Sequence, residues 1–329
     1  MQAFECMAIG SLPHTDVEQA MALVKANFSA IPFWPQLPRL SENEDMLVQF
    51  TQGMPAEESC DDLERLFTDY EELNADNYAV TYSASFEPFI ELVKKTKPAY
   101  AKGQIVGPFT LAAALTDKDA KAALYDETLR EIIVKTLSLK ALWQIKRIKE
   151  ASPSTTPIIF IDEPSISQLG TPAFLTVSGA NVEEMFKEIS DVIQAAGGLS
   201  AIHCCGKCDW SVPIASGVDI ISLDAYSYAQ NLSLFSKDVQ KFLEQGRKIA
   251  WGVVPTLDKE ALKSANLDKM LKVFEQAVNY LTKKGIDEKM ILDNSIITPS
   301  CGAGALTEEL AQHAMELTRE LSARLSIGS

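Results

Sequence analysis

Short apolar runs rich in β-branched residues alternate along the chain with longer stretches whose apolar positions recur every three or four residues. The short runs predict buried strands, and the longer stretches predict amphipathic helices. The predicted strands are residues 6–11, 30–34, 101–106, 157–161, 198–202, 218–223, 248–254 and 290–297. The predicted helices are residues 16–26, 61–73, 86–95, 120–151, 182–196, 232–245, 259–284 and 308–325, with Thr15 as the N-cap of the first.

An alternation of this kind is typical of parallel strands joined by helical crossovers. Eight repeats in 329 residues fit a TIM (β/α)8 barrel, an α/β fold that reaches this size as one domain. The glycine-rich fingerprint of an open dinucleotide-binding sheet is absent from the sequence. We therefore predict a single domain over residues 1–329, with a long polar excursion at 38–83, after the second strand and on the active-site side.

Composition and charge narrow the function classes. Hydrophobic residues make up 47% and charged residues 23% of the chain, as in ordinary soluble globules, and the formal net charge is −15. Such an acidic surface repels phosphate backbones and anionic lipids, so neither nucleic acid nor a membrane is an expected partner. The sequence has no run of 18 apolar residues and no N-terminal signal pattern, so we expect a cytoplasmic protein.

Residues with reactive or charged side chains follow several of the predicted strands. In a barrel the carboxyl ends of all strands meet at one face, where active sites lie. We therefore expect one composite site at that face. Its candidates are Gly10 and Ser11, Asp162 and Glu163, His203 to Cys205, Asp224 and Cys301.

His203, Cys205 and the distant Cys301 form a candidate metal-binding set. Six cysteines in 329 residues are too sparse for a disulfide framework, and clustered thiols in a reducing compartment more often bind metal or react. Thiolate and imidazole ligands select zinc, and three protein ligands leave a fourth position for substrate. Strand alternation should turn Cys204 away from this set. Two alternatives are a closed shell with Cys208 as fourth ligand, and a group of buried free cysteines without metal.

A zinc ion with one vacant position has two chemical uses. It can generate hydroxide from water, or it can bind a substrate thiol and lower the pKa of that thiol. A free thiol with a pKa of about 8.5 is only partly ionised at neutral pH. Because sulfur ligands make zinc a weaker Lewis acid, we expect alkylation of a thiolate rather than hydrolysis.

Five motifs occur in the order found in one enzyme family. They are Ile9-Gly10-Ser11-Leu12-Pro13-His14-Thr15, Gly107-Pro108-Phe109-Thr110-Leu111, Ile161-Asp162-Glu163-Pro164, His203-x-Cys205 and Pro299-Ser300-Cys301-Gly302. Together they resemble, over essentially the whole chain, the catalytic half of cobalamin-independent methionine synthase, in the superfamily that also holds uroporphyrinogen decarboxylase and corrinoid-linked thiol methyltransferases. The resemblance implies a TIM barrel in which Zn²⁺ activates homocysteine for methylation to methionine.

The same resemblance implies roles for individual residues. It makes His203, Cys205 and Cys301 metal ligands and places Asp224 at the position of the family's fourth ligand, a glutamate. It assigns the substrate carboxylate to the backbone of Ile9, Gly10 and Ser11, and the substrate ammonium to Asp162. These roles suit the chemistry, since backbone amides bind carboxylates and a carboxylate pairs with an ammonium. Glu42 is the candidate for the family's second ammonium-binding glutamate, and no catalytic residue beyond the metal site is implied.

The motifs depart from the family pattern in the half of the site that binds the methyl donor. The tryptophan that stacks on folate in the family falls on Ala112 to Ala114, and residues 251–256 contain no counterpart of the family's proton-donating histidine. A methyl-corrinoid, as methylcobalamin or on a partner protein, is therefore an expected donor alongside methyl-folate. Two other functions stay open: a corrinoid-linked methyltransferase to another thiol, such as a coenzyme thiol, and a non-catalytic zinc-binding protein.

Overall fold

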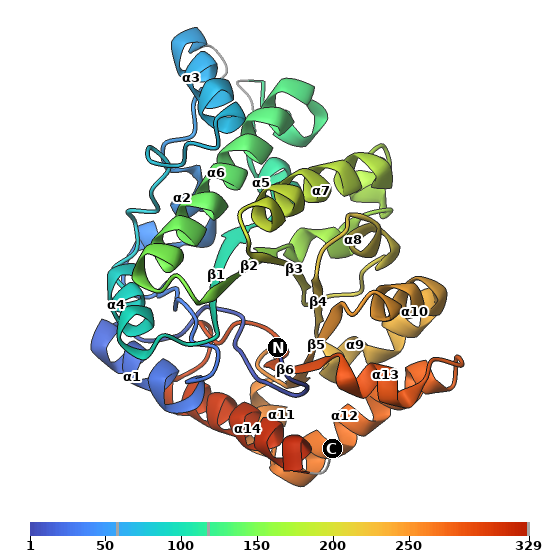
Figure 1. Cartoon of the computed structure of the whole chain (residues 1–329). Coiled ribbons are helices and arrows are strands. Elements are labelled where there is room, and N and C mark those ends of the chain that lie inside the picture. Colours follow the sequence, from blue (N-terminus) through green and yellow to red (C-terminus); the bar gives the residue numbers. More distant parts are fainter. Residues whose placement is uncertain (57–58, 117–118, 328–329) are drawn as a thin grey trace.

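A curved sheet of parallel strands forms the centre of the molecule (Figure 1). The computed structural model describes residues 1–56, 59–116 and 119–327. Within these ranges the sheet has six strands, and each pairs in parallel with the next along the chain. The strands are β1 Tyr100–Val106, β2 Thr156–Asp162, β3 Leu199–Cys204, β4 Ile220–Leu223, β5 Lys248–Val254 and β6 Ser295–Pro299. The predicted α/β class with parallel strands is thus confirmed.

The first two predicted strands do not form as regular strands. Residues 6–11 and 30–34 contribute only isolated parallel bridges, which join Cys6 to Ile297 of β6, Ser11 to Gln36, and Phe33 to Lys102 of β1. Pro32, Pro35 and Pro38 explain part of this, because proline has no amide proton for a ladder. The prediction of eight regular strands was therefore wrong at the N-terminus, although this segment still bonds to β1 and to β6.

Helices cover the outer face of the sheet (Figure 1). They are α1 Val17–Asn27, α2 Met46–Thr51, α3 Cys60–Glu71, α4 Phe86–Thr96, α5 Pro108–Ala114, α6 Glu127–Ala151, α7 Gly179–Ala195, α8 Ser211–Ala215, α9 Ala225–Leu232, α10 Ser236–Glu244, α11 Lys259–Lys263, α12 Leu267–Thr282, α13 Glu288–Asp293 and α14 Glu308–Ile327. Short 3₁₀ turns lie at η1 Glu42–Glu44, η2 Ala123–Tyr125, η3 Pro164–Gln168, η4 Pro172–Phe174 and η5 Ser233–Phe235.

Several predicted boundaries were wrong, and capping explains some of them. The helix expected at 120–151 begins only at Glu127, because the Asp126 side chain accepts a hydrogen bond from the Leu129 amide and caps it. The single helix expected at 259–284 is two helices, the second capped by Asn266. The helix expected at 232–245 begins after η5, as α10. The N-cap of α1 is Asp16 and not Thr15, because the Asp16 side chain accepts a hydrogen bond from the Gln19 amide.

The last predicted strand was also misplaced. Residues 288–293 form α13, and the strand begins only at Ser295. Asp287 caps this short helix by accepting a hydrogen bond from the Met290 amide. The first part of the apolar run at 290–297, which was predicted as strand, is therefore helical. The helix α5, directly after β1, was not predicted at all.

Two apolar cores lie on the two faces of the sheet. The inner one contains Met7, Ile9, Ile31, Ile158, Phe160, Ala201, Ile220, Ala250 and Ile296. The outer one, between strands and helices, is larger and includes Ile159, Ile161, Ile202 and Cys204. Neighbouring residues of one strand belong to different cores, as the two-residue period of a strand requires. Side chains at alternate positions near the strand ends therefore point to the inner face.

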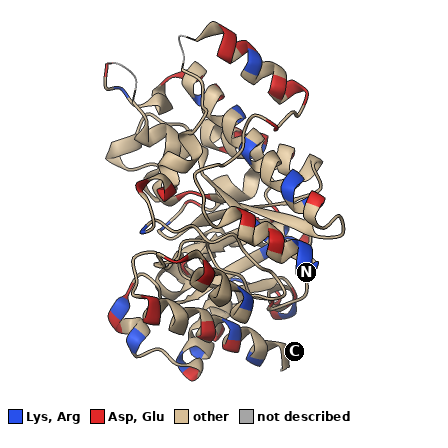
Figure 2. Cartoon of the chain, turned by 90° about the vertical axis from the view of Figure 1, so that its left-hand side faces the viewer, with Lys and Arg blue, Asp and Glu red and all other residues tan. Residues whose placement is uncertain are grey.

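Charged residues lie mainly on the helices, whereas the central strands are largely uncharged (Figure 2). The excursion at 38–83 contains η1, α2 and α3, and its residues 57–58 lie outside the described part. Pro38, Glu44 and Met46 from this excursion line the candidate site. No helix in the described ranges has the length and apolar character needed to cross a membrane.

Candidate metal centre

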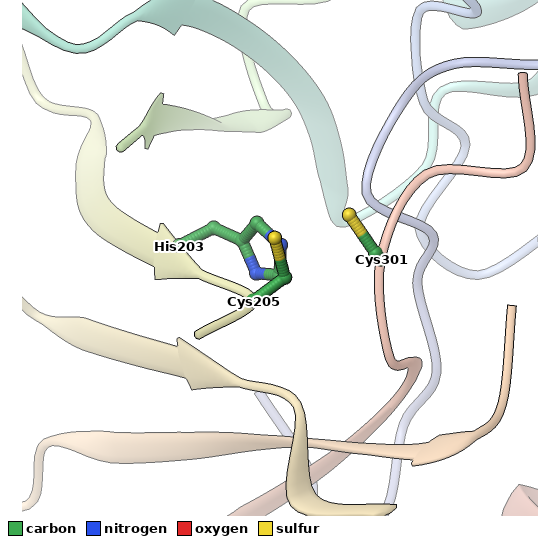
Figure 3. A group of neighbouring side chains, drawn as sticks. All are labelled: His203, Cys205 and Cys301. Atoms are coloured by element: carbon green, nitrogen blue, oxygen red, sulfur yellow. The ribbon is translucent and has the colours of Figure 1, made fainter. Parts of the chain in front are cut away.

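The structure brings His203, Cys205 and Cys301 together (Figure 3). One ligand atom from each lies within 4.8 Å of the others, and this is the one such group of three or more metal-ligating residues found in the described ranges. His203 lies near the end of β3, Cys205 directly after it, and Cys301 directly after β6. About a hundred residues of sequence separate these two loops, so the fold itself assembles the group.

The imidazole of His203 is held in one orientation. His203 is paired in register with Asp162 and Ser222, so these three side chains share one level of the inner face. The ring Nδ1 lies 3.0 Å from Ser222 Oγ. The other nitrogen, Nε2, is buried and has no hydrogen-bond partner among the described residues. A hydrogen bond from Nδ1–H leaves the Nε2 lone pair free, which is the state in which histidine binds a metal.

Hydrogen bonds from the loop after β5 hold the backbone of Cys301. The Cys301 amide donates to Thr256 Oγ1 over 3.0 Å, and the Thr256 hydroxyl donates to the Cys301 carbonyl over 2.9 Å. The Thr256 amide in turn donates to Ser300 Oγ over 3.0 Å. Gly302 follows, and an added Cβ there would lie 2.1 Å from Ser11 Oγ. Only glycine fits this close approach of the two loops.

The two sulfurs differ in protonation. A hydrogen bond from the Cys301 thiol and the neighbouring His203 imidazole lower the pKa of Cys205, although burial opposes them. The same hydrogen bond, together with burial, raises the pKa of Cys301. The contact between the two sulfurs thus moves their pKa values in opposite directions, so Cys205 is the more acidic thiol. A cation placed between the sulfurs would replace the proton of this hydrogen bond and favour two thiolates.

These observations fit a zinc ion. Tetrahedral ligands at Zn–S and Zn–N distances of about 2.3 and 2.0 Å lie roughly 3.3–3.8 Å from one another, so the group needs only a small contraction. The buried, unpartnered Nε2 of His203 is a polar atom that a metal would satisfy. Two soft sulfurs with one imidazole is a donor set that selects zinc over magnesium or calcium.

Asp224 and Cys208, the two other candidate ligands, do not belong to the group within the described ranges. The Asp224 carboxylate accepts a hydrogen bond from the Ser227 amide over 2.9 Å and caps α9. The thiol of Cys208 is buried and interacts with Cys204, and both side chains lie in the outer core. The structure thus offers three ligands at this position, with Asp224 nearby on the next strand.

A cavity of about 350 Å³ opens beside the three ligands. Its walls combine the metal group with two buried carboxylates, Asp162 and Glu44. Burial raises the pKa of both carboxyl groups. Asp162 Oδ1 has no hydrogen-bond partner among the described residues. The remaining wall residues include Ile9, Ser11, Gln36, Pro38, Met46, Leu257 and Gly304.

Glu44 takes the place that the sequence analysis gave to Glu42. Glu42 is exposed and does not line the cavity, whereas Glu44, two residues later, is buried and does. The Glu44 carboxylate accepts hydrogen bonds from the amides of Leu37 and Ala84 and from the Gln49 side chain. The role predicted for Glu42 stays a prediction, and Glu44 is the glutamate of this loop that reaches the cavity. The polar pattern of this loop gave no periodicity from which to choose between the two glutamates.

The turn at Ile9, Gly10 and Ser11 lies at the cavity wall as predicted. Gly10 has a φ of +151°, a backbone conformation that other residues rarely adopt. Ser11 links this turn to the loop that carries Cys301, because its hydroxyl accepts from the Gly304 amide and its carbonyl from the Ala303 amide. The N-terminal motif and the last motif therefore form one wall.

The remaining motif residues have a structural role that the sequence did not reveal. The buried carboxylate of Glu163 accepts hydrogen bonds from the amides of Phe109 and Thr110 and from the Thr110 hydroxyl. It thus satisfies the N-terminus of α5, which explains how the second and third motifs depend on each other. An added Cβ at Gly107 would lie 2.0 Å from this carboxylate, so only glycine permits the contact.

Comparison with known proteins identifies relatives of the chain. A methionine synthase from Methanocaldococcus jannaschii is 24% identical over 237 residues, which cover 71% of this chain and 65% of that protein. The matched part thus spans less than two thirds of the relative. A solved B12-independent methionine synthase from Shewanella sp. W3-18-1, in complex with selenomethionine, aligns with a TM-score of 0.50 at 16% identity and covers 75% of this chain and 69% of that one. This second likeness concerns the fold. No protein-family model matches the chain.

Proposed function

We propose that the chain belongs to the superfamily that contains cobalamin-independent methionine synthase and that it is a zinc-dependent methyltransferase that methylates the thiol of homocysteine. The observation that carries the proposal is the group of three soft donors, His203, Cys205 and Cys301, at the wall of a cavity with two buried carboxylates. Three protein ligands leave one coordination position for a substrate thiol.

Each part of the site has a task in this proposal. Bound zinc would lower the pKa of the substrate thiol and keep it ionised at neutral pH. His203 and the two cysteines would hold the metal, with Ser222 fixing the imidazole and Thr256 fixing the loop of Cys301. The protein thereby positions the sulfur nucleophile for in-line displacement: the S–CH3 bond would form as the bond between the methyl group and its donor breaks, and the electron pair of that bond would stay on the demethylated donor.

The carboxylates and the Gly10 turn would recognise the amino-acid end of homocysteine. Asp162 lies beside His203 on the inner face and has one oxygen without a partner, so it is suited to receive an ammonium group. Glu44 lines the same cavity and is the second acidic group there. Backbone amides of Gly10 and Ser11 would receive the carboxylate. Asp224 is proposed to support the site from the next strand rather than to complete the metal shell.

Two methyl donors lead to different expectations. The solved relative is described as B12-independent, so the comparisons do not support the corrinoid donor or corrinoid partner protein expected from the sequence. Ala112 to Ala114, where the family has a folate-stacking tryptophan, lie at the end of α5 and offer no aromatic face. A transfer assay with methyltetrahydrofolate and with methylcobalamin, run in parallel on the zinc-loaded chain, identifies the donor by methionine formed.

The rival functions make a weaker fit. A zinc store calls for four closing ligands, but Cys208 lies with Cys204 in the outer core. A coenzyme thiol without an amino group would leave Asp162 Oδ1 buried without a hydrogen-bond partner in the cavity wall, which is costly.

Thiol binding tests the proposal directly. Isothermal titration of the zinc-loaded chain with homocysteine, repeated in buffers of different ionisation enthalpy, should show one site and release of about one proton. Cys60→Ser is the matched control, because Cys60 is exposed and distant from the three ligands, and it should titrate like the wild type. Binding without proton release, or no binding at all, would contradict the proposal.

A further inference from the structure

A fully buried lysine lies on the inner face of the sheet, on the strand next to that of Asp162. Lys102 is on β1, and its ammonium lies 4.3 Å from the centre of the Phe160 ring. Burial lowers the pKa of Lys102 to about 8, although nearby Asp162 opposes this change. A buried charge of this kind costs stability unless its contacts offset the loss of water. Those contacts therefore indicate what the lysine does.

The ammonium supports the N-terminal turn from inside. Lys102 Nζ donates hydrogen bonds to the carbonyl of Ile9 and to Gln104 Oε1, the latter over 2.9 Å. The Gln104 amide group donates to the carbonyl of Trp34 over 3.0 Å. An added Cβ at Gly10 would lie 3.1 Å from Gln104 Oε1, so the turn packs directly on this pair. The lysine thus fixes the backbone of the Ile9–Ser11 turn, and Ile9 and Ser11 of this turn line the cavity.

The same ammonium is a counter-charge for Asp162. Burial raises the pKa of Asp162, and the attraction of Lys102 is the largest of the effects that oppose this rise. Asp162 pairs in register with Val106, four residues after Lys102 on the same face of β1. Lys102 thus lies near both groups that the proposed function assigns to the amino-acid end of the substrate, the Ile9–Ser11 backbone and Asp162.

Lys102 is not one of the residues that line the cavity. It is therefore not in contact with a bound thiol and acts only through its neighbours. We infer that Lys102 is a positioning residue for amino-acid recognition, which holds the Ile9–Ser11 backbone in place for a carboxylate. This inference rests on the proposed function, since it takes the substrate to be an amino acid with a thiol.

The affinities of four thiols distinguish a positioning role of Lys102 from a role in stability alone. Homocysteine carries both charged groups, 4-mercaptobutyrate only the carboxylate, 3-aminopropane-1-thiol only the ammonium, and 1-propanethiol neither. Their affinities are measured on the Co²⁺-substituted chain from the thiolate-to-cobalt charge-transfer absorption. Lys102→Met is compared with wild type and with Lys140→Met. Lys140 is a matched control because it is also buried, with a pKa lowered to about 8, but lies on helix α6.

We expect Lys102→Met to weaken homocysteine binding by about 10- to 100-fold, as small displacements of positioning groups do. Affinity for 1-propanethiol should change by less than about twofold, and Lys140→Met should leave the ratio of the two affinities unchanged. An equal loss for all four thiols, or an unchanged preference for homocysteine, would overturn the inference. A wild-type chain that binds none of the thiols would instead contradict the proposed function.

If Lys102→Met does not fold, Lys102→Gln provides the test. Its side-chain amide retains a donor for the Ile9 carbonyl but carries no charge. Because the hydrogen bond to Ile9 is kept, we expect the affinity for 4-mercaptobutyrate relative to 1-propanethiol to stay within about threefold of wild type. A loss of more than about tenfold in this ratio would contradict the assignment.

Discussion

Two groups of sulfur atoms lie on opposite faces of the sheet at the end of β3, and they differ in almost every physical respect. Cys205 lies on the inner side with His203 and Cys301, at the wall of a cavity. Cys204, its neighbour in sequence, is in the outer core with Cys208. On the inner side the pKa of Cys205 is lowered by its neighbours, whereas on the outer side burial raises the pKa of Cys208.

The difference shows that cysteine content alone does not make a metal site. Strand alternation decides which thiol meets the imidazole, and the crossing of β6 beside the N-terminal segment brings the second sulfur to the same side. The outer pair has apolar neighbours and no histidine, so it is a packing element. Each prediction below changes one residue on the inner or the outer side of the sheet and asks whether only that side responds.

Cys301→Ser should produce the largest effect. Protein zinc sites bind with about 10–16 kcal/mol in total, so loss of one of three ligands should weaken zinc binding by about a thousandfold or more. Competition with a chromophoric chelator measures this. Cys208→Ser is the matched outer control, and its zinc affinity should stay within about threefold of wild type. A similar loss in both variants would remove the distinction between the two sulfur groups.

Lys140→Met tests the outer layer through stability and pH. The pKa of Lys140 falls from 10.5 to about 8 because of burial, which corresponds to a cost of about 3 kcal/mol below pH 8. Since the unfolded chain binds the proton more tightly, wild-type stability should rise between pH 8 and 10.5 relative to the variant. Denaturant unfolding of both proteins at pH 7 and pH 10 checks this. A constant difference across that range would contradict it.

Ser222→Ala should have an intermediate effect on the inner side. Its hydroxyl lies 3.0 Å from His203 Nδ1 and fixes the ring, and loss of such a partner typically costs about 10- to 100-fold in metal affinity. Unfolding measurements on the metal-free protein provide the control, because that stability should change by only about 1 kcal/mol. Unchanged zinc affinity would show that the ring is oriented by something other than Ser222.

Asp224→Ala should have the smallest effect. Its carboxylate caps α9, so we expect a loss of about 1 kcal/mol in the free energy of unfolding. Zinc affinity should change by less than about threefold. Asp224→Asn retains the cap and should restore stability. A large drop in zinc affinity in both variants would indicate that Asp224 is a fourth ligand, which leaves no coordination position for the substrate thiol.

The sequence was sufficient to predict the inner metal group but not its surroundings. His203, Cys205 and Cys301 stand at strand ends, and parallel strands align those ends, so their proximity follows from alternation alone. The choice of Glu44 over Glu42 depends on the turn η1 and on three hydrogen bonds from distant segments. Asp224 was placed by its position in the resemblance, whereas its oxygen is used by the Ser227 amide.

The secondary structure was likewise predicted correctly where the local sequence determines it, and incorrectly where contacts between distant segments or helix caps do. Strand β5 is almost entirely buried and was predicted to the residue, whereas β1 to β4 were predicted with bounds off by one or two residues. The two N-terminal segments form only isolated bridges with their neighbours, and Pro32 interrupts the second of them, so the apolar runs there did not become regular strands. Local caps such as Asp126 and Asp287 moved helix starts that the apolar periodicity alone could not locate.

X-ray absorption at the zinc edge of the purified chain tests the central claim most directly. We predict about two sulfur ligands at roughly 2.3 Å and one imidazole nitrogen from the protein, and a third sulfur in the shell once homocysteine is added. A shell already closed by four protein ligands and unchanged by homocysteine, or a chain that holds no zinc after reconstitution, would contradict the account.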